Sequence, residues 1–407
     1  MKQLSADQLK KVFSSLPENP RVLVSGNFGT PKELLALFDS VVPEYRLHML
    51  NAQPGIPNRS GVRYETAFVG IGMRNSERLD YIPSRLSLLP VMLRDQLAPD
   101  VVLLHTSVPR FDTVSLGIEV NILPAAIESA REHGGIVVAQ ANSQMPYTYG
   151  DAQIYENEID FLFTHDEPLN VHAPTPISEI AHNIGSKIAD LVSSGSTLQL
   201  GIGSVPDAVV QRMTDRNDLR IWTEMFSDGV LNLEKHGALD SEIPITASFI
   251  FGSHELYQWL HLNRRVRMLR TEKTNDPSLI AKQAKMTSIN AALQVDLLDQ
   301  ANASRVRNKI YSGFGGSTDF IVGALHSRGG KSFMTLPSWH PKTNTSKIVP
   351  MITEGVTSFQ HSYVVTEQGI ATCFGHSESE QARNLIEHAA HPDTRDHLRS
   401  AAKKMGL

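Results

Sequence analysis

Short runs of β-branched and other apolar residues alternate with helix-like segments along the chain. In the first half such runs occupy residues 21–25 (RVLVS), 100–105 (DVVLLH) and 135–139 (GIVVA), and the first is followed by a helix-like PKELLALFDSVV that opens at Pro31. Continuous apolar runs fit strands covered on both faces, and strands that alternate with helices favour a parallel sheet. The sequence therefore predicts an α/β protein with mostly parallel sheets.

A change of texture near residue 180 predicts a domain boundary. Residues 167–176 (EPLNVHAPTP) are proline-rich, as in a linker, and a long helix-like pattern follows that we expect to end with Gly195 as its C-cap. A second α/β series then begins, with strand-like runs at residues 197–200, 220–222, 266–269 and 348–351. We expect an N-terminal domain of residues 1–180 and a C-terminal domain of residues 181–407.

The composition excludes several classes of function. The single cysteine, Cys373, rules out an internal disulfide and a Cys-rich zinc site, and we interpret it as a small buried hydrophobe. The net charge of −5 provides no positive field for nucleic acid or anionic membranes. Residues 1–16 read as a short amphipathic helix rather than a signal peptide, and no stretch approaches a membrane span. We therefore expect a cytoplasmic protein with neither a nucleic-acid nor a membrane partner.

A glycine turn in STLQLGIGSVPDAVVQRM is the sharpest local feature. It joins a strand-like run to a helix that carries Asp207 in its first turn. Glycine allows positive φ and close backbone approach, and a helix N-terminus presents unpaired N–H groups to an anion. The turn is a candidate phosphate or carboxylate site, with a ligand-free βα turn as the alternative. Its residues are Gly201, Ile202, Gly203, Ser204 and Val205.

Glu224, in IWTEMFSDG, stands at the carboxyl end of the next strand-like run. Ligands bind at this edge of open α/β sheets. Three interpretations remain open from the pattern: a ligand-facing carboxylate, a partner for the ribose of a dinucleotide, or a structural charge at a helix N-terminus. The spacing from Gly201 suits the dinucleotide, but Pro206 occupies the place of the expected third glycine.

A second glycine cluster, YSGFGGSTDF, contains Gly313, Gly315 and Gly316. Such a backbone can turn several N–H groups toward one oxyanion or phosphate, whereas the alternative is a flexible loop or bulge. Asp319 is expected to be the N-cap of the helix that follows, with a catalytic role as the less favoured alternative.

Other motifs are absent or weak. The sequence has no nucleophile elbow and no P-loop. His254-Glu255 followed by His261 does not have zinc-binding spacing, and His388 and His391 are expected to be surface or capping residues. We therefore expect no metal.

With these residues in view, the chain resembles the acetyl-CoA hydrolase/transferase family, and within it the group that includes 4-hydroxybutyrate CoA-transferases. The resemblance rests on LQLGIGSVPDAV, IWTEMFSDGVLNLEKHGAL, MTSINAALQVDL with YSGFGGSTDF, IVPMITEGVTS with VVTEQGIA, and the closing AAHPDTRDHL. Weaker similarities in the first half are LDYIPSRLSLLP, VSLG and NSQMPYTYGD. The similarity covers nearly the whole chain and is strongest from residue 195 onward.

The resemblance implies two CoA-transferase-like (NagB/RpiA-like) α/β/α domains and a glutamate that forms a glutamyl-CoA thioester. That glutamate matches Glu224, the turn at residues 201–205 matches a CoA-contacting loop, and the second glycine cluster matches a thioester-facing loop. Asn275 in TNDP and Glu367 in VTEQG match supporting residues. The nearby helix N-termini are expected to keep Glu224 ionised.

The implied reaction transfers coenzyme A from a short acyl-CoA (acetyl-, butyryl- or succinyl-CoA) to a small carboxylate such as 4-hydroxybutyrate, acetate or a dicarboxylate. Hydrolysis of acyl-CoA at the same site is the alternative. The resemblance also implies a homodimer or higher homo-oligomer. Two departures from the family concern acyl and acceptor recognition: VTEQGIATCFG replaces VTEYGVADLRG, and Tyr147 replaces a usual arginine.

Overall fold

The chain divides into two compact units that differ from the predicted domains at residues 174–180 and 244–274. The computed structural model describes residues 1–172, 176–356 and 360–407. Residues 173–175 of the predicted linker, and residues 357–358 at the end of IVPMITEGVTS, lie outside the described residues. Unit 1 comprises Met1–Ala173 and Pro244–Thr274, and unit 2 comprises Pro174–Ile243 and Asn275–Leu407. The sequence prediction assigned residues 244–274 to the C-terminal domain, whereas their contacts place them in unit 1.

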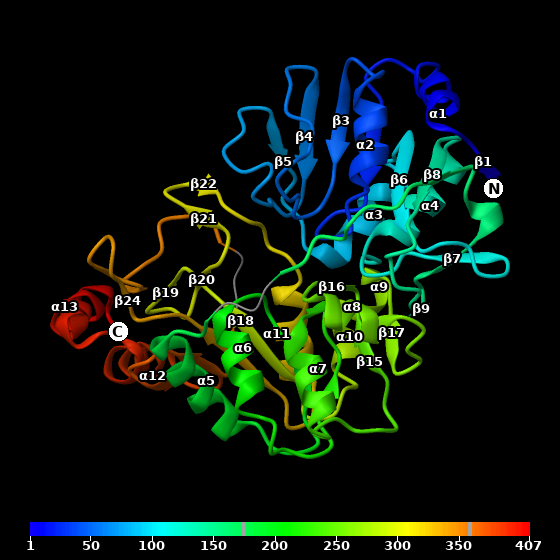
Figure 1. Ribbon diagram of the computed structural model, residues 1–407. Helices are drawn as coiled ribbons and strands as arrows, with labels where there is room; N and C mark the ends of the chain where they lie inside the picture. Colours follow the sequence, from blue (N-terminus) through cyan, green and yellow to red (C-terminus); the bar gives the residue numbers. More distant parts are fainter. Residues whose placement is uncertain (173–175, 357–359) are drawn as a thin grey trace. The chain divides into compact units, whose positions relative to one another are not determined.

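Strand pairing explains why this segment belongs to unit 1. Its strands β15 (Ile245–Ala247) and β17 (Val266–Met268) are parallel neighbours, and β17 also pairs with β9 (Tyr149–Gly150) from the first half of the chain (Figure 1). The run at residues 266–269 forms a strand, as predicted. Its own sequence could not reveal that it pairs with β9, more than a hundred residues earlier in the chain.

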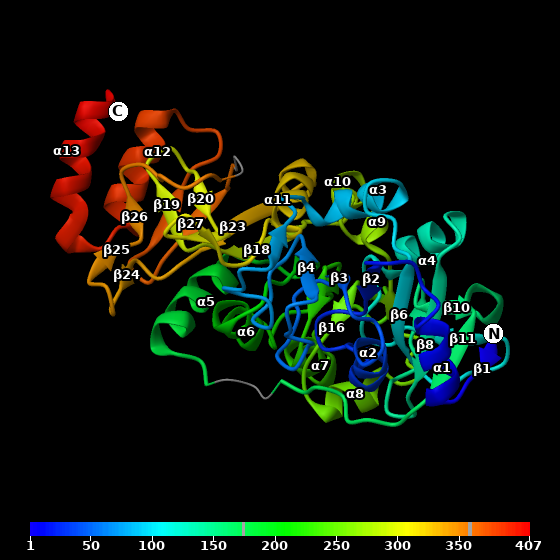
Figure 2. The ribbon, with the colours of Figure 1, turned by 90° about the horizontal axis from the view of Figure 1, so that it is seen from above.

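In the described part of unit 1, an eight-stranded sheet is parallel throughout. Its strands, in spatial order, are β1 (Lys2–Gln3), β11 (Phe161–Thr164), β8 (Ile136–Ala141), β6 (Val101–Thr106), β2 (Arg21–Val24), β3 (Tyr45–His48), β4 (Val62–Thr66) and β5 (Leu79–Tyr81). Helices cover both faces (Figure 2). One face carries α1 (Ala6–Phe13) and α2 (Lys32–Asp39), and the other carries α3 (Leu89–Arg94) and α4 (Leu123–Glu132). Helix α1 is shorter than the helix predicted for residues 1–16, because residues 2–3 pair with β11.

Unit 2 has, within its described residues, a six-stranded sheet that is parallel except at one edge. In spatial order its strands are β13 (Arg220–Ile221), β12 (Thr197–Gln199), β18 (Thr287–Ala291), β23 (Lys331–Thr335), β27 (Tyr363–Val365) and β28 (Ile370–Thr372). Only β28 runs antiparallel to its neighbour. Helices α5 (Glu179–Leu191) and α6 (Ser204–Gln211) lie on one side, and α10 (Pro277–Ile280) and α11 (Ser317–His326) on the other (Figure 2). The predicted α/β fold with mostly parallel sheets is thus confirmed.

Smaller elements complete the units. They are β7 (Thr113–Ser115), β10 (Gln153–Tyr155), α7 (Asp228–Lys235), α8 (His254–Leu260), α9 (Thr271–Thr274), β19 (Gln294–Asp296), β20 (Ala301–Asn302), β26 (Ile348–Val349), α12 (Glu378–Asn384) and α13 (Arg395–Met405). One predicted boundary is wrong: the C-cap of α5 is Val192, and Gly195 lies beyond it with a φ of 74°. The helix stops early because Val192 is already extended.

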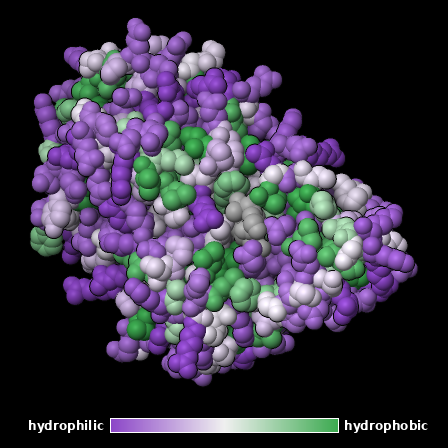
Figure 3. Space-filling model, turned by 180° about the vertical axis from the view of Figure 1, so that it is seen from behind, coloured by the Kyte–Doolittle hydropathy of each residue, from purple (hydrophilic) through white to green (hydrophobic). Residues whose placement is uncertain are grey.

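The face in Figure 3 is mostly hydrophilic, with hydrophobic residues in small separate groups. None of the helices in the described ranges combines the length and the apolar character needed to cross a membrane.

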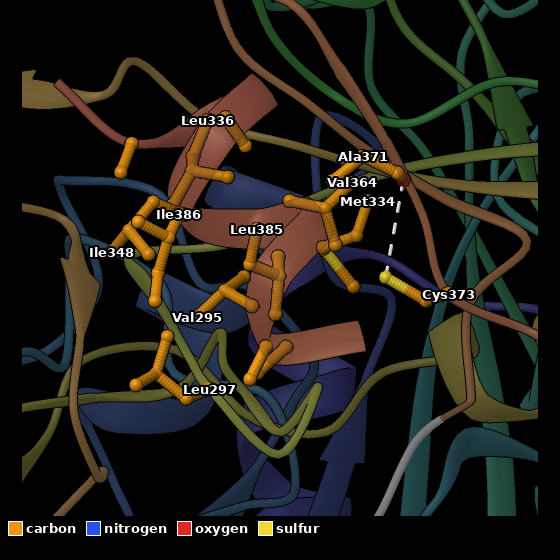
Figure 4. Close-up of a cluster of buried hydrophobic side chains, with 14 of the residues drawn as sticks. Val295, Leu297, Met334, Leu336, Ile348, Val364, Ala371, Cys373, Leu385 and Ile386 are labelled. Carbon is orange, nitrogen blue, oxygen red and sulfur yellow. Dashed lines mark hydrogen bonds between the residues drawn. The ribbon is translucent and has the colours of Figure 1, made fainter. Parts of the chain in front are cut away.

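Cys373 lies in the hydrophobic core of unit 2 (Figure 4). It is fully buried beside Met334, Val364 and Leu385, and its Sγ points to the carbonyl oxygen of Ala371 at 3.9 Å. Burial raises the pKa of the thiol far above its usual value. The interpretation of Cys373 as a small buried hydrophobe is confirmed.

Candidate active site

The first glycine turn and Glu224 leave adjacent strands at the same edge of the six-stranded sheet. Strands β12 and β13 are parallel neighbours. Just beyond them, the N–H of Leu200 donates to Oγ1 of Thr223 at 3.1 Å. Because Gly201 and Glu224 directly follow these two residues, both stand at the carboxyl edge, where open α/β sheets bind ligands.

The turn has the backbone that its glycines were predicted to supply. Gly203 is the N-cap of α6 with a φ of 127°, and Asp207 lies in the first turn of that helix. A Cβ at Gly201 would stand 3.1 Å from the carbonyl oxygen of Ile289 on β18, so the turn lies close against the sheet. The exposed Ile202 forms its tip.

Glu224 is held by groups that are distant in the sequence. Nδ2 of Asn275 donates to Oε2 of Glu224 at 2.8 Å. A Cβ at Gly316 would stand 2.0 Å from the same oxygen and 2.1 Å from Nδ2 of Asn275. A side chain at position 316 would therefore displace the ends of Glu224 and Asn275, and three of the predicted site residues meet at one point.

The second glycine cluster brings the start of α11 to this point. Gly315 has a φ of 58°, Gly316 is the N-cap, and the N–H of Gly316 donates to the carboxyl of Glu224. Gly313, two residues before Gly315, is buried. The predicted N-cap role of Asp319 is wrong, because the turn at Gly315 starts the helix three residues sooner and places Asp319 in the first turn, 1% exposed.

Burial raises the pKa of Glu224 to about 7. The residue is partly buried, and the loss of water around its carboxyl outweighs the hydrogen bond from Asn275, which lowers the pKa. The negative charge of Asp319 raises the pKa further, whereas the N–H of Gly316 lowers it. The helix N-terminus at Gly316, which was expected to keep Glu224 ionised, lowers the pKa less than burial raises it.

Within the described residues, no hydrogen bond joins Glu367 to Glu224. Glu367 follows β27, which lies four strand positions from β13 in the sheet. Its carboxylate accepts hydrogen bonds from the N–H of Ser338 at 2.8 Å and from the Ser338 hydroxyl. Burial opposes ionisation, but these bonds prevail and hold the pKa of Glu367 below its usual value. Glu367 thus holds the loop at Ser338 by hydrogen bonds, near the edge of the sheet opposite to β13.

Tyr147 and His391, which the sequence analysis singled out, make local structural contacts. Tyr147 is buried, and its hydroxyl lies 2.7 Å from Oγ1 of Thr113. His391 accepts a hydrogen bond from the N–H of Asp393, which confirms its capping role. The part of the chain that the structure describes contains no group of three or more His, Cys, Asp or Glu side chains that could hold a metal.

Sequence reasoning missed the electrostatic effect of Asp319 on Glu224. Its only signal was the position of Asp319 close behind the glycine cluster, which also fits an N-cap. Asn275 was identified through family resemblance alone, because TNDP has no distinctive chemistry until its partner is known.

Comparison with known proteins identifies the family. The acetyl-CoA hydrolase/transferase C-terminal domain matches residues 252–402. The 4-hydroxybutyrate coenzyme A transferase of Clostridium kluyveri is 33% identical over 418 residues, covering 97% of this chain and 96% of that protein. Succinyl-CoA:cyclohexane-1-carboxylate CoA transferase of Geobacter metallireducens is 37% identical over 341 residues, covering 80% of this chain and 76% of that protein.

A solved structure agrees with these relatives. The 4-hydroxybutyrate CoA-transferase from Porphyromonas gingivalis superposes with a TM-score of 0.83 and 29% identity, over 99% of this chain and 98% of that one. The resemblance drawn from the sequence is confirmed: the chain belongs to the acetyl-CoA hydrolase/transferase family, as a CoA-transferase.

Proposed function

We propose that the protein transfers coenzyme A from a short acyl-CoA to a small carboxylate through a glutamyl-CoA thioester on Glu224. The donors we expect are acetyl-, butyryl- or succinyl-CoA, and the acceptors are 4-hydroxybutyrate, acetate or a dicarboxylate. One observation carries the proposal: the carboxyl of Glu224 lies at the ligand-binding edge of the sheet, between Nδ2 of Asn275 and the N–H of Gly316.

The reaction needs neither ATP nor a net proton. The Glu224 carboxylate attacks the thioester carbonyl, the C–S bond breaks, and an acyl-glutamyl anhydride and the CoA thiolate form. The thiolate then attacks the glutamyl carbonyl, the C–O bond to the acyl group breaks, and the acyl carboxylate leaves. An incoming carboxylate reverses both steps, which gives ping-pong kinetics.

The two donors to Glu224 suit the second step. When the thiolate adds to the glutamyl carbonyl, negative charge develops on the oxygen that Asn275 and Gly316 already contact. Donors fixed in advance at such an oxygen are each worth about 3 kcal/mol of transition-state stabilisation. Gly315 supports them by setting the backbone of the turn.

The turn at residues 201–205 is the proposed contact for CoA. It stands beside Glu224 and ends at the N-terminus of α6, which favours an anionic group. Binding of the remote part of CoA can then align the thioester with the carboxylate.

Hydrolysis is the second candidate, because the matched domain includes hydrolases as well as transferases. Water that reached the anhydride or the thioester would release the acid and free CoA. Exclusion of water therefore separates the two activities.

Removal of the nucleophile tests the proposal. Glu224→Ala and Glu224→Gln should lower CoA transfer by about a thousandfold or more, while the exposed Glu378→Gln in the same unit leaves it unchanged. Acyl-CoA followed by borohydride should mark Glu224, as read by peptide mass spectrometry. Full transfer by Glu224→Ala would refute the assignment.

Free thiol measured with and without a carboxylate acceptor distinguishes transfer from hydrolysis. A transferase should release little thiol with or without an acceptor, because CoA passes into the new thioester, whereas a hydrolase releases thiol at full rate from acyl-CoA alone. A panel of carboxylates against one donor then identifies the acceptor.

A further inference from the structure

Two buried carboxyl groups share the start of α11. The N-cap residue Gly316 contacts the carboxyl of Glu224, and Asp319 lies three residues on, 1% exposed. At 1.5 Å of rise per residue, Asp319 is within one helical turn of the point where α11 meets Glu224. A helix N-terminus stabilises one negative charge, so a second carboxylate in the same turn competes with the first.

Asp319 is one of several charged groups on the elements that surround Glu224. Asp207 lies in the first turn of α6, Asp228 in the first turn of α7, and Asp276 is the N-cap of α10. Asp207 accepts a hydrogen bond from Ser227, and Asp276 accepts one from the N–H of Ser278. Of these four carboxylates, only Asp319 is buried, and it lies on the helix whose N-cap Gly316 meets Glu224. Its negative charge raises the pKa of Glu224.

The donors that assist the chemistry create a difficulty that Asp319 can solve. Asn275 and Gly316 stabilise the developing oxyanion, but they also stabilise the resting Glu224 carboxylate. A carboxylate stabilised in this way gains little by becoming a neutral thioester. A repulsive charge that acts only on the resting state restores the balance.

We propose that Asp319 is a positioning residue that keeps the resting Glu224 carboxylate high in free energy relative to the uncharged glutamyl-CoA thioester. The inference rests on the proposed function. In the half-reaction, enzyme carboxylate and acyl-CoA become enzyme thioester and free acyl carboxylate. Repulsion from Asp319 opposes the left side alone, so it shifts the equilibrium toward the covalent intermediate.

The inference links two measurable quantities. The same repulsion that drives thioester formation also favours protonation of Glu224, because both processes remove the charge. Above the pKa of Glu224, each unit that Asp319 adds to that pKa should raise the equilibrium constant for the thioester about tenfold.

Asp319→Asn removes the charge and keeps the shape. Its matched control is Thr318→Val in the same helical turn, which removes a hydroxyl that has no hydrogen-bond partner within the described ranges. We would measure the pH profile of the acyl-CoA half-reaction, and the thioester fraction at pH 8 at a fixed ratio of acyl-CoA to carboxylate by intact-protein mass spectrometry.

Asp319→Asn should lower the apparent pKa by about one unit and the thioester equilibrium constant about tenfold, and Thr318→Val should change neither. An unchanged equilibrium in Asp319→Asn would overturn the inference even if the pH profile moved. Absence of a thioester in the wild type would instead overturn the proposed function itself.

A stability cycle keeps the test open if Asp319→Asn is inactive. At pH 8 this substitution should be more favourable to thermal stability when Glu224 is present than in a Glu224→Gln background, because only the former removes a repulsion. Equal effects in the two backgrounds would overturn the inference. If Asp319→Asn does not fold, Asp319→Ser enters the same cycle.

Discussion

At the scale of single residues, Gly316 controls how the carboxyl of Glu224 can lie. Gly316→Ala should be tolerated by the backbone, whose φ is −100°, but the new Cβ would overlap Oε2 of Glu224. We expect turnover to fall about a hundredfold, while the free energy of unfolding falls by less than about 3 kcal/mol. Steady-state kinetics and urea unfolding measure the two effects.

Gly355→Ala is the control, because a Cβ there would meet nothing within 4 Å. It should leave both measurements unchanged. Full turnover by Gly316→Ala would show that the carboxyl does not need its present position.

The raised pKa of Glu224 also predicts a dependence of stability on pH. The folded protein holds this proton more tightly than the unfolded chain, whose pKa is near 4.5. The contribution of Glu224 to the free energy of unfolding therefore falls as the pH rises from about 4.5 to 7. Glu224→Gln lacks this loss, so relative to the wild type it should gain on the order of 2 kcal/mol between pH 5 and pH 8. Thermal denaturation at both pH values measures the difference, and a gap that does not change with pH would contradict the assignment.

Part of this site could be predicted from the residues alone. The pattern placed Glu224 at the end of a strand, and resemblance to a family selected one of three interpretations. The pattern could not show that Asn275 and Gly316 meet Glu224, because these contacts depend on how distant segments fold together. Asp319 was assigned to the wrong position because an acid near a helix start fits both a cap and a first turn.

At the scale of elements, the strands of the first half were predicted from runs rich in β-branched and other apolar residues. Strands β2, β6 and β8 agree with the predicted runs. Strand β18 (TSINA) was missed because it buries polar residues, which satisfy one another: Ser288 donates to Oε1 of Gln199 at 2.7 Å, and Asn290 donates to Oγ of Ser288 at 2.8 Å. A strand whose polar groups pair across the sheet looks like a loop in the sequence.

The packing of α5 on α6 ties the proposed CoA turn to the core. A Cβ at Gly185 would stand 2.7 Å from Cβ of Ala208 and 2.9 Å from the backbone nitrogen of Val209. Gly185→Ala should therefore push α6 outward and lower the free energy of unfolding by about 1–3 kcal/mol, although alanine favours a helix by about 1 kcal/mol.

Because α6 begins at the turn, the KM for acyl-CoA should rise as well. Urea unfolding and steady-state kinetics test both effects, with the exposed His182→Ala on the same helix as the control. A more stable Gly185→Ala protein would show that the two helices separate without cost.

At the scale of the whole molecule, the chain passes between its two units more than once. It leaves unit 2 after Ile243 and returns at Asn275, the residue that donates to Glu224. A linear search for a linker finds one boundary and misses this excursion, because no proline-rich run like that at residues 167–176 marks either of its ends.

A fragment of residues 1–180 should therefore not fold as a stable unit. It would lack β15 and β17 and would leave the edge of β9 unpaired. We expect it to show no cooperative thermal transition by circular dichroism, in contrast to the full chain. A sharp transition in the fragment would show that the segment 244–274 is dispensable to unit 1.

The burial of Cys373 has a practical consequence for colorimetric thiol assays of this enzyme. It is the only cysteine in the sequence, and it is fully buried with a raised pKa. A chromogenic disulfide reagent should therefore count liberated coenzyme alone, with no background from the native polypeptide. Under denaturing conditions the same reagent should register one further equivalent per chain, so a single cuvette can report both hydrolysis of acyl-CoA and loss of structure.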